Sequence, residues 1–342
     1  METILILAHT EPDSSLTKPM LEALAAGVAL HTALPGSQLV AGFIGENAEA
    51  DANLVAGCGV ARFLAVSGPD FVPSRYSTDA AAAEALVKAA QATIVVAPHT
   101  SRFGRCLPGV AQRLGGRADT HVTRISVDSG TIGINRWFYR QRMEAVVQRA
   151  QRPWFMLIDP GSHSAWTGSP GQVALETVSP PAISTRTTVG GFREPPATQQ
   201  TVRPEAALLF VAGAGWTKKQ GDGQTHVSEA EKLIGDFLAV TRASLGSSKS
   251  LVDQGGDGQA VLSFLSHFNQ IGQTGSTPRH PKGLSTCCHG EEPHTVGWRF
   301  INERRAINLD PNCGWARGKA DVLYVADAFK VVAELSRLLK QQ

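Results

Sequence analysis

Short apolar runs that alternate with helical segments limit most strongly what this chain can fold into. The first run, Thr3–Ala8, is partly β-branched, and a helical pattern follows over Met20–Leu30. An alanine-rich helix that reaches about Gln91 is expected to start at Thr78 or Asp79 as N-cap. Three more runs read as strands: Gln38–Ile44, Arg62–Val66 and Thr93–Pro98. Strands that alternate with helices predict a parallel α/β sheet.

A polar loop, His99–Arg105, follows the fourth predicted strand. Ligands of α/β proteins bind at the carboxyl ends of parallel strands, so this loop is one candidate site. The alternative is that Ser101 caps the helix around Leu107–Leu114 and the arginines are solvated. Three later segments are predicted as further strands, antiparallel and at the edge of the sheet: Val122–Val127, Asn135–Val147 and Pro153–Ile158.

The stretch Thr177–Glu205 is rich in Pro, Thr and Gly and has little periodicity. A connection this long is unusual inside one domain, so we place a domain boundary here. We predict an N-terminal α/β domain over residues 1–195, a linker over 196–204 and a second α/β domain over 205–342. The expected elements of the second domain are strands at Ala206–Gly215, Arg304–Pro311 and Asp321–Val325, a helix at His226–Arg242, and a last helix capped by Asp327.

Composition narrows the class of protein. The chain has 342 residues, of which 42% are hydrophobic and 18% charged, typical of a folded protein with a sizeable core. A net charge of +2 gives no argument for a nucleic-acid partner. The apolar runs are shorter than a membrane span, so the chain is not expected to be embedded in a membrane. The five cysteines form no paired spacing, which indicates a reducing, cytoplasmic location.

A short polar loop in the second half, Asn269–Ser276, suits a flat ligand. Two glycines, Gly272 and Gly275, flank Gln273 and Thr274 and let the backbone approach a ring closely. The amide and the hydroxyl between them both donate and accept hydrogen bonds. The loop therefore predicts contact with a heteroaromatic ring, and a plain turn is the alternative.

Five motifs of the second half occur in an order that resembles the α subunit of the electron transfer flavoproteins. The third, at Gly290 and His294, is kept only in outline, whereas the fifth is nearly complete. The first half fits more loosely, through residues such as Thr100–Leu107, so the resemblance covers essentially the whole chain. The other four motifs stand at Ser248–Gly255, Gln270–Gly275, Ala306–Pro311 and Ala320–Val332.

The resemblance implies a fold and a function. The fold is α/β with two domains, each a mostly parallel sheet flanked by helices, the C-terminal one a Rossmann-like domain that binds FAD. The N-terminal domain packs on a β subunit that carries AMP, giving a heterodimer. The resemblance further implies an electron carrier without substrate chemistry of its own. Such a carrier is expected to pass electrons from a flavoprotein dehydrogenase, of the acyl-CoA or N-methyl amine type, to a membrane quinone reductase.

The resemblance also assigns roles to single residues. Gln273 and Thr274 are placed at the isoalloxazine ring, with Thr274 near N5, and His294 at the pyrimidine edge of the ring. Asn308 and Asp327 are placed at the adenosine end, where their side chains suit ribose hydroxyls. No catalytic residue and no metal ligand is expected. The implied cofactor-binding residues are Ser248, Lys249, Gln270, Gly272, Gln273, Thr274, Gly275, Gly290, His294, Asn308 and Asp327.

Some positions depart from the family pattern. Gly215 and Lys249 stand where the family has arginine, and lysine is a point charge that cannot fork or stack as a guanidinium does. His289 replaces a serine, and Glu291 and Glu292 add negative charge to a loop expected near phosphates. These changes favour a second hypothesis, a flavin-poor subunit that serves as a scaffold in a dehydrogenase complex.

Two further alternatives arise from parts of the sequence. Cys287, Cys288, His289 and His294 suggest a metal site, although adjacent cysteines rarely ligate one ion together. A nucleotide-binding stress protein that stands alone would fit only the first domain.

Overall fold

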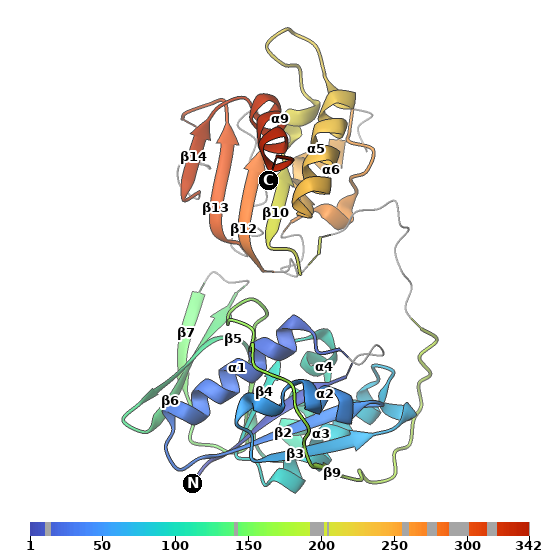
Figure 1. The fold of residues 1–342 in the computed structure, drawn as a ribbon, viewed down its shortest axis with the longest axis vertical. Helices are drawn as coiled ribbons and strands as arrows, with labels where there is room; N and C mark the ends of the chain where they lie inside the picture. The colour runs from blue at the N-terminus through green and yellow to red at the C-terminus, as the bar shows by residue number, and fades with distance from the viewer. Residues whose placement is uncertain are drawn as a thin grey trace. The chain divides into compact units, whose positions relative to one another are not determined.

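The computed structural model divides into two compact units, Met1–Phe192 and Arg193–Gln342 (Figure 1). The residues that the structure describes are 1–10, 15–139, 143–191, 202–203, 205–254, 260–271, 279–286, 301–312 and 320–341. Each unit contains its own parallel sheet with flanking helices. The predicted fold class, two α/β domains with mostly parallel sheets, is therefore confirmed.

The first unit is built on a nine-stranded sheet with the order β7-β6-β5-β8-β4-β1-β2-β3-β9. All neighbours are parallel except β5–β6 and β6–β7, which are antiparallel and extend the sheet at one edge. The strands are β1 (Thr3–His9), β2 (Gln38–Gly45), β3 (Arg62–Ser67), β4 (Ile94–Pro98), β5 (Arg117–Asp128), β6 (Thr131–Phe138), β7 (Met143–Gln148), β8 (Trp154–Ile158) and β9 (Leu175–Thr177).

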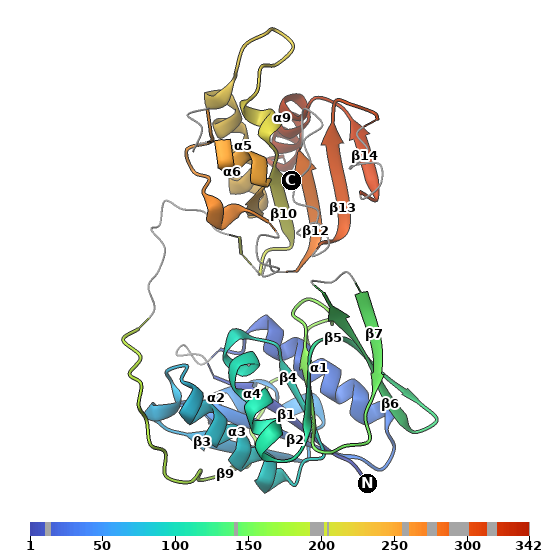
Figure 2. The ribbon, with the colours of Figure 1, turned by 180° about the vertical axis from the view of Figure 1, so that it is seen from behind.

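Helices cover both faces of this sheet. Helix α1 (Lys18–Ala33) covers one face, and α3 (Tyr76–Ala90) and α4 (Ser101–Arg113) cover the other, as the two opposite views show (Figures 1 and 2). The short helix α2 (Ala48–Leu54) contacts β2 and β3. Strands β1 and β4 are buried on both sides and supply the centre of the apolar core.

Strand β8 differs from the prediction of an antiparallel edge strand. It lies inside the sheet, between β4 and β5, and runs parallel to both. Its side chains, Trp154 to Ile158, are all at most 1% exposed. A continuous apolar run of this kind is typical of a central parallel strand that is buried on both faces.

The predicted caps of α3 and α4 are also wrong. Helix α3 begins at Tyr76 with Arg75 as N-cap, so Thr78 and Asp79 lie inside the helix. Helix α4 begins at Ser101 and is capped by the side chain of Thr100, which accepts from the amide of Phe103. Arg102 is not solvated but buried, and its guanidinium pairs with Asp79. Tertiary burial of this ion pair outweighs the capping preference of Asp79.

The second unit is a five-stranded parallel sheet with the order β11-β10-β12-β13-β14. Helices α5 (Val227–Thr241) and α9 (Ala328–Leu339) contact each other and pack on an apolar cluster that includes Phe210, Trp216 and Phe329. The strands are β10 (Leu208–Ala212), β11 (Ser244–Ser247), β12 (His280–Thr286), β13 (Ile301–Asn308) and β14 (Val322–Val325).

No helix in the described part of the chain has both the length and the apolar character that crossing a membrane requires.

Candidate functional site

The strand order of the second sheet identifies one place where a ligand can bind. The chain goes from β10 through α5 to β11 on one side, whereas β12 lies on the other side of β10. In doubly wound sheets, ligands bind outside the carboxyl ends of the strands at such a reversal. At this point the amide of Gly213 donates to the carbonyl of Thr286 at 3.0 Å. The candidate site is therefore the carboxyl edge of the second sheet, centred between β10 and β12.

Three buried polar side chains at this edge have an atom without a partner. Ser247, Ser285 and Asn308 stand at or next to the ends of β11, β12 and β13, and each is at most 1% exposed. Ser247 Oγ, Ser285 Oγ and Asn308 Nδ2 have no hydrogen-bond partner among the described residues. A buried polar group without a partner costs about 1–3 kcal/mol, so such groups suit a ligand that would satisfy them. They are spread along the edge, as an extended ligand requires.

Thr286 differs from its neighbour Ser285, because its hydroxyl is fully used within the protein. Trp216 Nε1 donates to Thr286 Oγ1 at 2.7 Å, and the same hydroxyl donates to the carbonyl of Val211 at 2.9 Å. These bonds tie η3 (Ala214–Thr217), the turn after β10, to the end of β12. Gly215, at which the resemblance leads one to expect arginine, is buried in that turn.

Two predicted site residues meet at the end of β11. Ser248 is the N-cap of the short helix α6 (Lys249–Asp253), and its Oγ accepts from the amide of Leu251 at 3.3 Å. Gln270 is 8% exposed and forms an isolated parallel bridge with Ser247. The amide of the next residue, Ile271, donates to the carbonyl of Ser247 at 3.1 Å. The loop that starts at Gln270 therefore leaves from the carboxyl edge of the sheet.

Lys249 lies beside this group but is exposed. Its Nζ stands 3.7 Å from Asp253 Oδ2, and both side chains are accessible to water. A surface pair of this kind contributes at most about 1 kcal/mol. The lysine is thus free to move toward a ligand at the edge.

The two residues predicted for an adenosine group are also close together. Asn308 ends β13 and Asp327 follows β14, and these strands are neighbours. The amide of Ala326 donates to the carbonyl of Asn308 at 3.2 Å. Asp327 Oδ1 accepts from the amide of Phe329 at 2.9 Å, so the predicted cap of the last helix is confirmed.

The described site residues therefore form two groups at opposite ends of one edge. With neighbouring strands about 4.8 Å apart, the distance from β11 to β14 is about 19 Å. This length suits an extended dinucleotide. Gly272, Gln273, Thr274, Gly275, Gly290 and His294 lie outside the described residues, as do Cys287, Cys288, His289, Glu291 and Glu292.

Ser247 and Ser285 were missed by sequence reasoning, because no motif contains Ser285 and Ser247 stands just before one. The signal that would have found them is a small hydroxyl residue at the end of a predicted parallel strand. That signal is weak, since Thr286 shows the same pattern and has a structural role.

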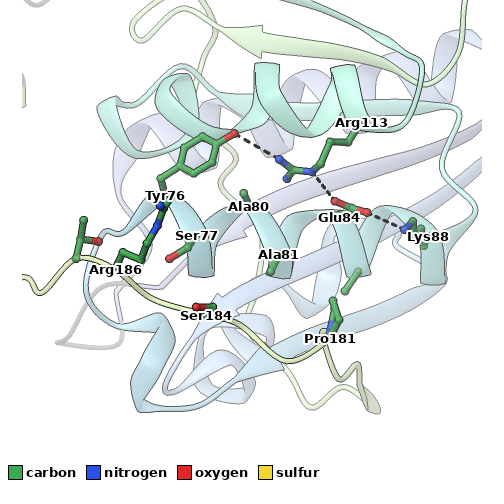
Figure 3. A pocket seen from close by; sticks show the side chains of 12 residues that line it. Tyr76, Ser77, Ala80, Ala81, Glu84, Lys88, Arg113, Pro181, Ser184 and Arg186 are labelled. Atoms are coloured by element: carbon green, nitrogen blue, oxygen red, sulfur yellow. Dashed lines mark hydrogen bonds and ion pairs between the residues drawn. The ribbon is translucent and has the colours of Figure 1, made fainter.

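The first unit contains a cavity of about 480 Å³, which is a second candidate for a ligand site (Figure 3). It lies between α3, the end of α4 and the segment from Pro181 to Thr187. Glu84 accepts from Arg113 Nε and from Lys88 Nζ, both at 2.7 Å. Because these charges already satisfy one another, the cavity offers a ligand less than the edge of the second sheet does.

The fold and the candidate site together define a class: a doubly wound α/β protein with a candidate ligand site at the carboxyl edge of its second sheet. Residues 4–183 match the electron transfer flavoprotein domain. The match spans more than half of the chain, and the chain belongs to the electron transfer flavoprotein family. Members of this family generally bind a flavin.

Proposed function

We propose that this chain is the α subunit of an electron transfer flavoprotein and that its second unit binds FAD. The observation that carries the proposal is the row of buried polar atoms on Ser247, Ser285 and Asn308, which have no hydrogen-bond partner among the described residues and stand near the reversal of strand order. From Ser247 on β11 to Asp327 after β14, donors and acceptors are placed along about 19 Å of edge, which fits the hydroxyl, phosphate and ring groups of an extended dinucleotide.

Each end of the edge would hold a different part of FAD. Asn308 Nδ2 and the carboxylate of Asp327 would bind the adenosine end. At the other end, Gln270 starts the loop whose Gln273 and Thr274 would bind the isoalloxazine ring. Gly272 and Gly275 would admit the ring, and Gly290 the pyrophosphate. When bound, the flavin supplies the electron chemistry, while the chain binds it, orients it and excludes water.

The charge around the ring sets its tendency to accept electrons. Negative charge develops at the pyrimidine edge of a flavin on reduction, so a nearby cation or donor raises the potential. His294 and Lys249 are the residues proposed for this role. Lys249 is exposed and shares its charge with Asp253, so we expect a weaker effect than that of an arginine at this position.

The partners follow from the carrier function. The first unit, which carries the family domain, would pack against a β subunit that holds AMP. A dehydrogenase acting on acyl-CoA or on N-methyl amines would donate electrons, and a membrane quinone reductase would accept them. The chain would have no substrate chemistry of its own.

A flavin-poor scaffold subunit is the second candidate function. It is favoured by Gly215 in a position where the family has arginine, and by the acidic pair Glu291–Glu292. The scaffold hypothesis and the carrier hypothesis predict different amounts of flavin in the purified complex.

The test is the visible spectrum of the α chain purified together with its β subunit. We expect bands of bound flavin and about one FAD released per heterodimer on denaturation. The α chain alone should hold FAD poorly, because the partner completes the site. A complex that lacks flavin bands after incubation with excess FAD would instead support the scaffold.

A further inference from the structure

Three side chains that commonly bind metals meet at the carboxyl edge of the first sheet. His99 follows β4, Asp159 follows β8, and His121 lies within β5. One ligand atom of each lies within 4.8 Å of the other two. We propose that His99, His121 and Asp159 bind one divalent transition-metal ion, and that Zn²⁺ fits this site well.

The backbone fixes the positions of the three residues. Strands β5, β8 and β4 are neighbours in that order and run parallel, so their carboxyl ends share one edge. The amide of His99 donates to the carbonyl of Ile158 at 2.8 Å, and the amide of Asp159 donates to the carbonyl of Val122 at 2.8 Å. The three side chains therefore start from a rigid frame.

His121 owes its position to an irregularity in β5. The register of β5 against β8 shifts between Asp119 and Val122, and His121 has φ 55°. This left-handed conformation costs a residue other than glycine roughly 1–2 kcal/mol. Bulges next to functional sites often redirect a side chain in this way, and retained strain favours a functional interpretation.

The result is a compact group with a usable donor set. His121 Nδ1 lies 3.0 Å from Asp159 Oδ1. The ring centroids of His99 and His121 are 4.1 Å apart, and the two ring planes form an angle of 77°. Zinc binds imidazole nitrogens and carboxylate oxygens at about 2.1 Å, which places tetrahedral ligands roughly 3.4 Å apart. The ligand atoms, at most 4.8 Å apart, need to approach one another by up to about 1.4 Å to reach this spacing. The side chain of His121 is 45% exposed, which leaves the fourth position open to water.

One nearby positive charge opposes the binding of a cation. Burial is the main reason that the pKa of His99 is lowered to about 4, and the positive charges of His121 and Arg136 add smaller contributions. The guanidinium of Arg136 is held by Asp119 Oδ1 at 2.7 Å and by Thr120 Oγ1 at 3.2 Å. Because Asp119 also pairs with Arg149, it offsets only part of the charge of Arg136, and we expect the site to bind metal less tightly than an all-cysteine site does.

The test is calorimetric titration of the full chain with Zn²⁺ after removal of metal by a chelator. We expect one ion to bind with a micromolar or lower Kd. Asn tolerates the left-handed backbone, so H121N should keep the fold, verified by circular dichroism. Loss of a residue that only supports a metal ligand lowers metal affinity roughly 10–100-fold. H121N and D159N each remove a ligand itself, so each should raise the Kd for zinc by more than this factor.

Two controls separate this site from other ligands in the chain. His267 pairs with Asp253 at 3.1 Å, and this pair belongs to no group of three metal-binding side chains among the described residues, so H267N should bind zinc as the parent does. In C287S/C288S, binding should persist, and Co²⁺ should give visible bands without thiolate charge transfer. The proposal is overturned if the folded chain binds no stoichiometric ion, if H121N binds equally well, or if C287S/C288S abolishes binding.

Discussion

Ile271 occupies the space that a side chain on Gly246 would need. A β-carbon on Gly246 would lie 2.6 Å from Ile271 Cγ2, and Ile271 is fully buried. Gly246 stands in β11, next to Ser247, and Ile271 precedes the glycine loop proposed to bind the flavin ring. This contact therefore sets where the loop begins.

We predict that Gly246→Ala displaces Ile271 and weakens FAD binding. Overpacking of this kind costs about 1–3 kcal/mol of folding stability. The measurements are FAD retention of the α–β complex and urea unfolding of the chain. Gly235→Ala in α5 is the matched control, because nothing lies within 4 Å of its new β-carbon. Because alanine favours a helix more than glycine does, Gly235→Ala should raise the free energy of unfolding by up to about 1 kcal/mol.

Substitution of the neighbouring residues Ser285 and Thr286 separates an effect on ligand binding from an effect on folding. Ser285 Oγ is buried and has no partner among the described residues, so Ser285→Ala should not destabilise the FAD-free chain and should raise its stability by up to about 1–3 kcal/mol. If this hydroxyl binds FAD, the Kd of Ser285→Ala for FAD should be about 3–10-fold higher than that of the parent, because one hydrogen bond is lost. Thr286→Val removes bonds to Trp216 and Val211 and should destabilise the chain whether FAD is present or not. Equal FAD affinity of Ser285→Ala and the parent would remove Ser285 from the site.

The sequence predicted the alternating elements well because their apolar runs are long and regular. The sequence did not predict the position of β8 inside the sheet or its parallel direction. A strand that is buried on both faces has no alternating pattern from which its neighbours can be inferred. The sequence prediction also failed for Asp79, whose type favours a helix cap but whose partner, Arg102, lies 23 residues further along the chain. Only the packing of α3 on α4 in the folded chain brings these two residues together.

The ion pair of Asp79 and Arg102 should be critical for the first unit. Arg102 Nη2 lies 2.7 Å from Asp79 Oδ1, and the two side chains are 9% and 0% exposed. Arg102→Ala leaves a buried carboxylate without its main partner, which costs about 3–5 kcal/mol. Arg105 approaches the same carboxylate at 3.5 Å but is largely exposed, so Arg105→Ala should cost under about 1 kcal/mol. The measurement is the free energy of unfolding of both variants by chemical denaturation. Similar losses of stability in Arg102→Ala and Arg105→Ala would contradict the claim that the buried pair is the stronger one.

The stability of the first unit should fall as the solution becomes acidic. Burial, aided by the charge of Arg102, lowers the pKa of His9 to about 4. The unfolded chain, with an imidazole pKa near ~6.5, binds the proton more readily, so stability is present above pH ~6.5 and lost as pH falls toward 4. The loss from His9 is on the order of 3 kcal/mol.

His9→Leu should reduce this pH dependence. Unfolding free energies measured at about pH 7.5 and about pH 5 should differ less in the variant than in the parent, because the variant has no imidazole to protonate at this position. An unchanged difference would mean that His9 is not the group that couples folding to protons.

The candidate sites were only partly predictable for a related reason. The resemblance supplied Ser248, Gln270, Asn308 and Asp327, and the structure places all four at one edge of the second sheet. The cluster of His99, His121 and Asp159 was not predicted, because its members are far apart in sequence and one depends on a bulge. Two of the three do follow predicted strands, which is the only signal that the sequence offered.

The most direct test of the central claim is a titration of the α–β complex with FAD, followed by the quenching of flavin fluorescence. The proposal predicts saturation at one FAD per heterodimer, with a raised Kd in Ser285→Ala and a comparable Kd in Gly235→Ala. Saturation at far less than one FAD by the folded complex would contradict it and leave the scaffold function in its place.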